Sequence, residues 1–393
     1  MPRLVWNRSI HRERRTDFKM SDRQRLRVGI VGCGQIADAH LQEIAKLDIA
    51  HVAAVCDVHR DLAVQAAARF HVPGVFDNVD EMLDASRLDV VHVATPAQTH
   101  HDLAVHLLER GCHVYIEKPV AIDAPEVESI LSTAHRTNRL VCVGHDQLFD
   151  PVWLDCRDRV AAGEIGEVRH VESVLGYPLS GQFGALVVSD PNHWVRRLPG
   201  GLFHNVISHP LYRITDLMPG AEPAVDAHWF SRGEATFPTE LRAHLRGDAV
   251  TGALTFDTGI EPQRITRVYG TAGCLEVDFD GQTIQRRRQA RLPGAFAKLE
   301  TPWRQWREAG ANLRRNLARF LKSDIHYFAG MGRLFDEFYR AVLHGEPAPI
   351  PGEEIVRVTR VMDAIFDQCR GSAERLPRPS IRPESRPSLA HSV

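Results

Sequence analysis

The chain has 393 residues, and at roughly 150 residues per domain this length predicts two domains with additional terminal segments. Hydrophobic residues make up 44% of the chain and charged residues 25%, which excludes a mostly disordered, collagen-like or membrane-embedded protein. The formal net charge of -2 provides no overall positive field, so we expect no nucleic-acid partner.

The cysteine pattern and the hydropathy indicate the compartment. The seven cysteines are scattered and none forms a C-x-x-C pair, which favours a reducing compartment over a disulfide framework or a structural zinc site. No uncharged apolar run reaches about 18 residues, and the N-terminus lacks the apolar core of a signal peptide. We therefore expect a cytoplasmic protein without a metal site.

Both terminal segments differ in composition from the rest of the chain. Residues 1–24 are rich in Lys and Arg, which predicts a basic flexible arm, although Met20 is an alternative start of the protein. Residues 371–393 combine proline with serine and arginine, which predicts a disordered tail. The folded part is expected between these two segments.

Short apolar runs alternate with helical patterns over residues 25–148. This rhythm is typical of β-α units, and their right-handed connections give a doubly wound parallel sheet, the Rossmann fold. The predicted strands are 26–31, 52–56, 90–94, 113–116 and 140–143. The predicted helical segments between them include 36–44, 62–70 and a helix that contains 103–108.

Residues 149–370 are expected to form a second domain of the α/β class. From about residue 149 the elements become longer and the alternation less regular. Strand patterns over residues 168–175 and 268–279 predict a mostly antiparallel sheet that is open on one face. Because an exposed apolar sheet face usually finds a partner, we expect a homodimer or homotetramer.

The sequence from Gly32 to Ala37 has the pattern G-x-G-x-x-A between a predicted strand and a predicted helix. Gly32 permits the tight turn, Gly34 lets the backbone approach a pyrophosphate, and Ala37 lets the helix pack on the strand. Asp57 ends the next strand, where its carboxylate would bind both ribose hydroxyls and repel a ribose phosphate, which favours NAD over NADP. Arg60 could accommodate that phosphate, or could be a solvated helix residue. The expected cofactor contacts here are Gly32, Gly34, Gln35, Ile36, Ala37, Asp57 and Arg60.

A Thr-Pro pair and a Glu-Lys-Pro sequence stand at the ends of two later predicted strands. Ligands of open parallel sheets bind at the carboxyl ends of the strands, so Lys118 would face the cofactor crevice. There its ammonium could stabilise the alkoxide that develops as hydride leaves, and the Lys118–Pro119 peptide is a candidate for the cis form. Glu-Lys-Pro taken alone fits a surface turn equally well. The residues expected at the cofactor site are Thr95, Pro96, His100, Glu117 and Lys118.

A third group consists of a Gly-Gly pair followed by Asn205 and His209. At helical spacing these two residues reach the same face. A neutral imidazole can take a hydroxyl proton because its unperturbed pKa of about 6.5 lies near working pH, which makes His209 the candidate general base. The alternative is a histidine satisfied in the domain core. Pro210 lacks a backbone N–H, so it should kink this helix or restart it near His209.

These segments together resemble the glucose-fructose oxidoreductase/inositol dehydrogenase/rhizopine catabolism (Gfo/Idh/MocA) family over residues 27–369. The resemblance rests on the order and spacing of the fingerprint and of the sequences at 94–100, 111–119, 163–168, 200–209 and 269–275. It implies a Rossmann domain and a substrate-binding α/β domain, with the nicotinamide held between them and the open sheet packed in oligomers. It also implies oxidation or reduction of a hydroxyl on a sugar, cyclitol or nucleotide sugar.

The resemblance assigns roles to individual residues. Lys118 matches the lysine of the family's Glu-Lys-Pro, and His209 matches the histidine of its Asp-x-x-x-His pair. Asn205 stands where that pair usually has aspartate, and an amide can neither act as a base nor raise the basicity of a histidine by negative charge. Members that act on nucleotide-linked amino-sugar acids look similar, with Asn at this place, so the substitution shifts the expected substrate. The substrate-binding candidates are Lys118, His145, Trp194, Arg197, Asn205 and His209, and Asp146 would line the same cleft.

The family does not account for a basic segment at residues 286–323. Residues 286–322 carry eleven Lys/Arg and two acids, and the tryptophans and leucines among them fall on one helical side. Such a helix can lie on an anionic membrane surface. An insertion that carries tryptophans more often packs against a subunit or covers a cleft, so we expect packing rather than membrane contact.

The predicted function is NAD(P)-dependent dehydrogenation of a CH–OH group on a sugar, nucleotide sugar or cyclitol, in surface polysaccharide biosynthesis. Two alternatives stay open. One is a glycosidase that uses tightly held NAD for a transient oxidation, and the other is a redox-silent NAD-binding regulator or scaffold.

Overall fold

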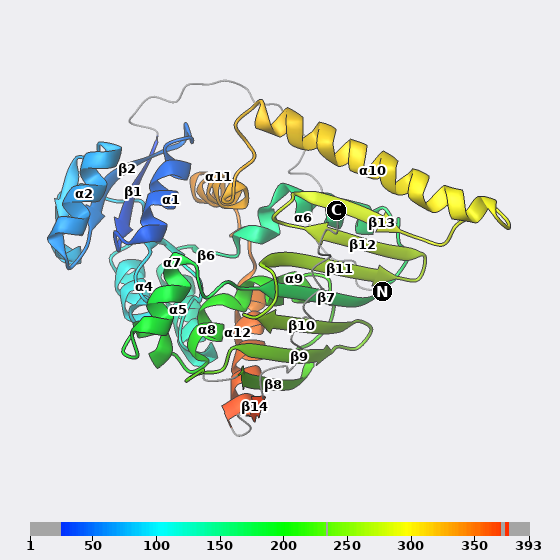
Figure 1. The fold of residues 1–393 in the computed structure, drawn as a ribbon. Coiled ribbons are helices and arrows are strands. Elements are labelled where there is room, and N and C mark those ends of the chain that lie inside the picture. Colours follow the sequence, from blue (N-terminus) through cyan, green and yellow to red (C-terminus); the bar gives the residue numbers. More distant parts are fainter. Residues whose placement is uncertain (1–24, 233–234, 371–373, 377–393) are drawn as a thin grey trace, which may run out of the picture.

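The computed structural model describes residues 25–232, 235–370 and 374–376, so the expectations for residues 1–24 and for most of 371–393 lie outside the described residues. Two β-sheets lie next to each other, each with its own helices (Figure 1). The N-terminal sheet is at the left of the view and the second sheet at the right, with helices α11 and α12 near their junction.

The first sheet has six parallel strands in the order β3-β2-β1-β4-β5-β6, which confirms the predicted doubly wound sheet. The strands are β1 (Leu26–Val31), β2 (Ala50–Cys56), β3 (Gly74–Phe76), β4 (Val90–Val93), β5 (His113–Ile116) and β6 (Val141–Val143). The helices are α1 (Gln35–Ile44), α2 (Arg60–Phe70), α3 (Val79–Ser86), the 3-10 turn η3 (Ala97–Thr99), α4 (His100–Glu109) and α5 (Ala124–Thr137). The strand order reverses between β1 and β4, and open sheets of this kind bind ligands at that point.

The second sheet has eight strands in the order β13-β12-β11-β7-β10-β9-β8-β14. Only the pairs β7–β10 and β8–β14 are parallel, so the predicted mostly antiparallel sheet is confirmed. The strands are β7 (Val168–Gly176), β8 (Ala224–Arg232), β9 (Glu240–Arg246), β10 (Thr251–Asp257), β11 (Gln263–Gly270), β12 (Gly273–Asp278), β13 (Thr283–Arg287) and β14 (Glu374–Leu376). The helical elements are η4 (Asp146–Phe149), α6 (Pro151–Ala161), α7 (Gln182–Ser189), η5 (Trp194–Arg197), α8 (Gly201–Val206), α9 (Ser208–Thr215), α10 (Phe296–Phe320), α11 (Ala329–His344) and α12 (Gly352–Arg370).

Two local predictions for this domain are wrong. The single strand expected over 268–279 is two strands, because the chain turns between Gly270 and Gly273 and pairs β11 with β12. Residues 374–376 were expected in a disordered tail but form β14, because their backbone pairs with β8 at the edge of the sheet.

One face of the second sheet is covered and the other is charged. Helices α6, α9 and α12 contact the strands on the covered face. On the other face Arg267 forms ion pairs with Glu172 at 3.2 Å and with Glu276 at 2.7 Å. This open face is therefore rich in charged pairs rather than apolar.

Helix α11 returns the chain to the Rossmann sheet. The Phe335 ring centroid lies 4.9 Å from that of Tyr115, and the Tyr339 hydroxyl hydrogen-bonds to His92 at 2.8 Å. These contacts are fully buried. The last third of the chain therefore helps to build the core of the first domain.

Helix α10 runs along the edge strand β13 (Figure 1). The side chain of Asn312 accepts from the backbone N–H of Ile284 at 3.3 Å and donates to its carbonyl at 3.0 Å, as a neighbouring strand would. Trp303 and Trp306 are 54% and 73% exposed, and Trp306 lines a cleft between α10 and β13. The expected packing of this segment against a subunit stays a prediction. No helix in the described ranges is long and apolar enough to cross a bilayer.

We predict that Asn312→Ala lowers the free energy of unfolding by about 2–4 kcal/mol, because both outward backbone groups of Ile284 lose their partner. Urea unfolding followed by circular dichroism measures the change. Gln305→Ala, at an exposed position of the same helix, is the control and should change stability little. Equal stability of the two variants would show that α10 is not anchored through Asn312.

Candidate active site

The loop between β1 and α1 fits a pyrophosphate. Gly32 has a φ of +92°, and a Cβ there would lie 2.7 Å from the backbone at the end of β4, so only glycine fits. Ala37 is fully buried, which brings α1 close to the sheet. A Cβ at Gly34 would meet no atom within 4 Å. Open space therefore lies beside Gln35 and Ile36 at the N-terminus of α1, where backbone N–H groups favour an anion.

Asp57 follows β2 and holds the glycine loop. Its Oδ2 accepts from the backbone N–H of Cys33 at 2.8 Å, and its Oδ1 accepts from that of His59 at 2.8 Å. Each carboxylate oxygen has a further lone pair, so Asp57 can also accept from ribose hydroxyls. Arg60 lies 3.4 Å from Asp77 in an exposed ion pair, which fits the interpretation of Arg60 as a solvated helix residue.

His100 connects the two strand-end sequences. Its Nε2 lies 2.8 Å from the carbonyl oxygen of Thr95, the residue before Pro96, and its Nδ1 lies 2.9 Å from that of Pro119. Burial lowers the pKa of His100, and a neutral imidazole donates to only one of these carbonyls at a time. The peptide between Lys118 and Pro119 is cis, as predicted. His100 thus holds the Thr-Pro and Lys-Pro turns together from a buried position.

Glu117 is buried behind Lys118. Its carboxylate accepts from His40 Nε2 at 2.9 Å and from the backbone N–H of Lys118 at 3.1 Å. Burial alone would raise the pKa of Glu117, but the hydrogen bond from His40 and the neighbouring positive charges lower it overall. His40 Nδ1 lies 2.9 Å from His92 Nδ1, so a buried chain of polar groups runs from Glu117 to Tyr339 in α11.

Lys118 lies where the two domains meet. Its Nζ donates to the backbone carbonyl of Asn205 in α8 at 3.0 Å. Burial lowers the pKa of the ammonium, and the carboxylates of Glu117 and Asp146 oppose that effect. A lysine from the Rossmann domain is therefore positioned by the backbone of the second domain.

His209 belongs to a hydrogen-bonded cluster around Tyr212. The Tyr212 hydroxyl lies 2.8 Å from His209 Nδ1, accepts from the backbone N–H of Gln147 at 3.2 Å, and donates to Asp146 Oδ1 at 3.4 Å. A hydroxyl has one proton and two lone pairs. Since its proton goes to Asp146 and one lone pair to Gln147, the other lone pair accepts from His209 Nδ1–H. This count leaves the Nε2 of His209 unprotonated.

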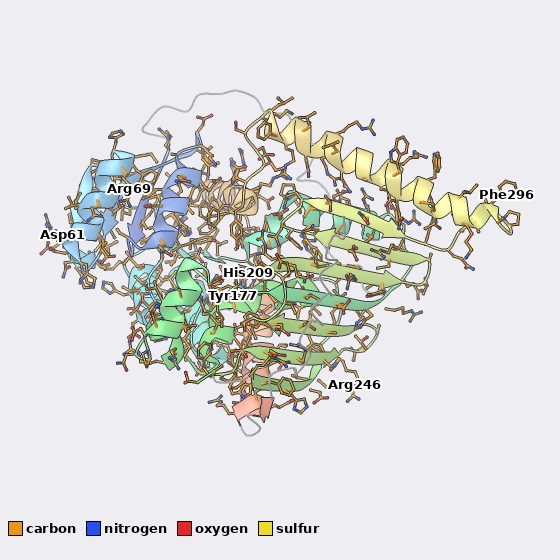
Figure 2. All side chains as sticks on the ribbon, viewed as in Figure 1. Asp61, Arg69, Tyr177, His209, Arg246 and Phe296 are labelled. Atoms are coloured by element: carbon orange, nitrogen blue, oxygen red, sulfur yellow. The ribbon has the colours of Figure 1, made fainter. Side chains whose placement is uncertain are left out.

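The electrostatics of this cluster keep His209 neutral. Burial, followed by the charges of Lys118 and Arg213, lowers the pKa of His209 well below its usual value. Burial, together with the charge of Glu117, raises the pKa of Asp146 to about 7. The His209 side chain is still 20% exposed and lies near the junction of the domains (Figure 2). A neutral imidazole that solvent can reach is the form that a general base needs.

Tyr212 was not anticipated from the sequence. It lies three residues after His209, and that spacing places both on one helix face. The signal was therefore present, but the contact with Gln147 depends on the fold. Arg213, also unanticipated, is fully buried and donates to Gln147 Oε1 at 2.8 Å and to Ser173 Oγ at 2.9 Å.

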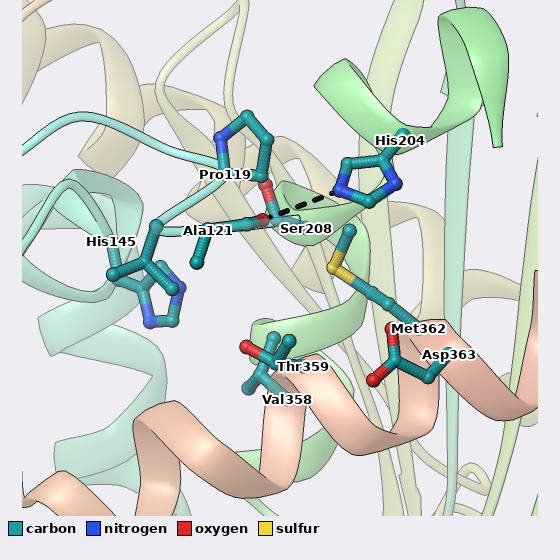
Figure 3. A pocket seen from close by; sticks show the side chains of 10 residues that line it. Pro119, Ala121, His145, His204, Ser208, Val358, Thr359, Met362 and Asp363 are labelled. Atoms are coloured by element: carbon teal, nitrogen blue, oxygen red, sulfur yellow. Dashed lines mark hydrogen bonds between the residues drawn. The ribbon is translucent and has the colours of Figure 1, made fainter. Parts of the chain in front are cut away.

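His145 lies on the other side of Tyr212, with 4.5 Å between ring centroids. Burial lowers the pKa of His145 to about 3. The ring also lines a small pocket beside Ala121, His204 and Ser208 (Figure 3). The pocket has a volume of about 10 Å³, which admits a water molecule and not a sugar. A sugar must therefore bind outside this pocket.

Asn205 and His209 lie in separate helices, α8 and α9, so the expectation that they share one helical face is wrong. The reason is the expected effect of Pro210, because the chain starts a new helix at Ser208. The predicted restart is confirmed. Asn205 meets Lys118 through its backbone carbonyl.

The two remaining substrate-binding candidates lie in η5. The carbonyl of Trp194 accepts from Gln98 Nε2 at 2.9 Å, which links η5 to the Rossmann loop after β4. Arg197 is exposed on the same turn. The geometry therefore brings Trp194 to the domain junction and leaves Arg197 in contact with solvent.

Comparison with known families agrees with this architecture. The family model of the oxidoreductase family with an NAD-binding Rossmann fold matches residues 26–145, and that of the Gfo/Idh/MocA C-terminal domain matches residues 153–276. The chain belongs to the Gfo/Idh/MocA family. The resemblance seen in the sequence is confirmed, and residues 26–145 of this Gfo/Idh/MocA protein form an NAD-binding Rossmann domain.

Individual curated proteins are similar to this chain. D-glucoside 3-dehydrogenase of Escherichia coli (strain K12) is 31% identical over 144 residues, 36% of this chain and 41% of the relative. Inositol 2-dehydrogenase of Rhizobium meliloti (strain 1021) is 27% identical over 202 residues, 50% of this chain and 56% of the relative. The chain spans about half the length of these curated relatives.

Among solved structures, the WlbA dehydrogenase from Bordetella pertussis in complex with NADH and UDP-GlcNAcA superposes with a TM-score of 0.71. The superposition covers 90% of this chain and 97% of that chain at 20% sequence identity. At this identity the similarity shows a shared fold.

We predict that Gly34→Val weakens NAD binding by about tenfold or more without destabilising the protein. A Cβ at this position finds no atom within 4 Å, so the added side chain enters open space, and it occupies the space beside the N-terminus of α1. Titration calorimetry with NAD and a thermal melt measure the two quantities. An unchanged Kd would place the pyrophosphate elsewhere.

Proposed function

We propose that the protein is an NAD-dependent oxidoreductase that transfers a hydride between nicotinamide and a hydroxyl-bearing carbon of a sugar, nucleotide sugar or cyclitol. One observation carries the proposal. Lys118 of the Rossmann domain donates to the carbonyl of Asn205 in the second domain at 3.0 Å, and its charge, after burial, lowers the pKa of His209. An ammonium and a neutral imidazole at one place are the two groups that alcohol oxidation requires.

Gly32, Gly34 and Asp57 would hold NAD, which would supply the acceptor or donor of the hydride. Lys118 can donate to the substrate oxygen, because an ammonium has three protons and only one is used by the carbonyl of Asn205. Its charge stabilises the alkoxide that develops on the substrate. Because Lys118 is already held in position, the reaction does not have to lose the entropy of ordering its side chain.

His209 takes the hydroxyl proton at Nε2 in the oxidation direction. Its Nδ1–H remains bonded to the Tyr212 hydroxyl, which in turn donates to Asp146. The carboxylate of Asp146, 3.8 Å from His209 Nδ1, stabilises the imidazolium that forms. Asp146 thereby supplies the negative charge that Asn205 cannot provide. Tyr212 and Asp146 are positioning residues in this scheme, because neither contacts the reacting atoms.

The substrate class is proposed from the names of similar proteins and from Arg197 of this chain. The similar proteins are named for a glucoside and an inositol, and the superposed structure holds UDP-GlcNAcA. Arg197, exposed in η5, is suited to a carboxylate or phosphate of such a substrate. We favour a nucleotide-linked sugar used in surface polysaccharide biosynthesis.

A substrate screen tests the function. The protein is incubated with NAD or NADP and a panel of sugars, cyclitols and nucleotide sugars, while the absorbance of the reduced nicotinamide is followed. Turnover with any of them supports the proposal. Sugar release without net cofactor reduction would instead identify a glycosidase that oxidises its substrate transiently. NAD binding without any turnover over the panel would favour a regulator.

We predict that Lys118→Ala lowers kcat by at least about a hundredfold, because the developing alkoxide loses its cation. The Kd for NAD should change by less than about threefold, since the lysine acts on the substrate oxygen. Lys46→Ala, which removes an exposed lysine of the ion pair with Glu43, is the control. Normal turnover of Lys118→Ala would refute the assignment.

We predict that kcat/KM falls as the pH falls through about 7, where Asp146 becomes protonated and its negative charge is lost. In Asp146→Asn this dependence should disappear, and the plateau should fall by about ten- to a hundredfold. Tyr212→Phe removes the hydrogen bond to His209 but leaves the Asp146 carboxylate 3.8 Å away, so it should lower the plateau and keep the pH dependence.

A stability measurement separates this role from a structural one. The pKa of Asp146 is raised in the folded protein from 3.8 to about 7, so its ionisation costs stability as the pH rises between these values. Asp146→Asn should therefore raise the melting temperature at pH 8 more than at pH 5. A pH profile of Asp146→Asn identical to that of the wild type would exclude Asp146 from the proton path.

A further inference from the structure

Helix α10 presents its apolar side chains to the outside. The helix spans 25 residues and lies at the periphery, with Phe296 at its outer end (Figure 2). At 100° per residue, six exposed side chains share about one third of its circumference. These six, between 54% and 73% exposed, are Leu299, Trp303, Trp306, Leu313, Leu317 and Phe320, and we refer to them as the α10 stripe.

The opposite face of α10 is polar and bonded to the protein. Glu308 accepts from a backbone N–H of β13 at 2.8 Å, and Asn312 pairs with Ile284. Arg315 forms an ion pair with Asp155 of α6 at 2.7 Å. Rolling the helix to bury the stripe would break all of these contacts. The stripe is therefore held outward, and no residue in the described ranges covers it.

Positive charge borders the stripe. A cleft of about 540 Å³ between β13 and α10 is lined by five arginines and one acid, namely Arg286, Arg288, Arg304, Arg307, Arg314 and Glu308. The guanidinium of Arg307 stacks over the Trp303 ring at 4.9 Å, at the margin of the stripe. In the part of the chain that the structure describes, no carboxylate lies within ion-pair distance of Arg307 or Arg314.

We propose that α10 binds the surface of an anionic phospholipid bilayer, with its axis in the membrane plane. The α10 stripe enters the boundary between headgroups and acyl chains, where Trp, Phe and Leu are favourable. The neighbouring arginines bind headgroup phosphates, and the negative surface potential attracts the whole segment.

A second copy of the chain fits this surface less well. Residues 286–322 contain eleven Lys/Arg and two acids, and a two-fold contact would bring this segment against itself. Like charges would then face each other around an apolar centre, whereas interface cores are depleted of charge. An anionic bilayer supplies both an apolar layer and the opposite charge.

Flotation of the full chain with vesicles tests the proposal. Wild-type protein should float with phosphatidylcholine–phosphatidylglycerol vesicles and remain at the bottom with phosphatidylcholine alone. The triple variant Trp303→Ser, Trp306→Ser, Leu317→Ser should bind about a hundredfold more weakly, because three large apolar groups are lost from an exposed face. The double variant Val64→Ser, Leu186→Ser removes exposed apolar groups elsewhere and should bind as the wild type does.

A charge variant tests the electrostatic contribution of the arginines to membrane binding. Arg307→Gln with Arg314→Gln should lower the vesicle partition coefficient by roughly ten- to thirtyfold, and added salt should weaken wild-type binding. The matched control is Arg136→Gln with Arg169→Gln, two exposed arginines on other elements, which should leave binding unchanged.

Three results would overturn the proposal. The first is no flotation of the wild type with anionic vesicles, and the second is equal flotation with neutral vesicles. The third is a sedimentation coefficient that falls in the stripe variant without vesicles, which would identify a second copy as the partner. Unchanged thermal melts of all variants show that the comparison is made on folded protein.

Discussion

The hydrogen bond from Lys118 to the backbone of Asn205 sets the geometry of the whole site. It links the residue after β5 in one domain to α8 in the other. Because the acceptor is a backbone carbonyl, the position of the ammonium relative to the second domain does not depend on the side chain of Asn205. The acceptor is a carbonyl dipole rather than a carboxylate. The ammonium therefore keeps most of its charge available for another oxygen, which a full ion pair would have neutralised.

The second constraint is the number of hydrogen bonds that the Tyr212 hydroxyl can form, one as donor and two as acceptor. The Tyr212 hydroxyl accepts hydrogen bonds from the backbone N–H of Gln147, after β6, and from His209 of its own helix. It donates its proton to Asp146. In the proposed mechanism, with Asn at position 205, the negative charge beside the histidine comes from Asp146, which follows the last Rossmann strand. The same chemical requirement is then met by a residue 63 positions earlier in the chain.

Much of the first domain could be predicted because its signals are local. The glycine loop, the strand ends and the cis peptide at Lys118 depend on neighbouring residues, and β1 and β5 have the predicted limits. The hydrogen-bonded cluster around Tyr212 could not be predicted, since it depends on the backbone N–H of Gln147, 65 residues away in the sequence. The short strand β3 was missed because three residues carry no periodicity.

The orientation of α10 shows the limit of periodicity as a signal. The pattern of residues reveals an amphipathic helix but not which face turns inward, and here the polar face does so because Asn312 matches the free edge of β13. An outward apolar face is thus a property of the tertiary structure alone.

The edges of the second sheet bear on how this chain can associate with others. On one side the outward backbone groups of Ile284 and Arg286 are bonded to side chains of α10. On the other side β14 pairs with the last three residues of β8, and Gln368 of α12 bonds to the backbone of Val225 and Ala227. Within the described part of the chain, neither rim offers a long row of free peptide groups to which a foreign strand could be added. Association with another chain by strand addition is therefore disfavoured at both ends of the sheet.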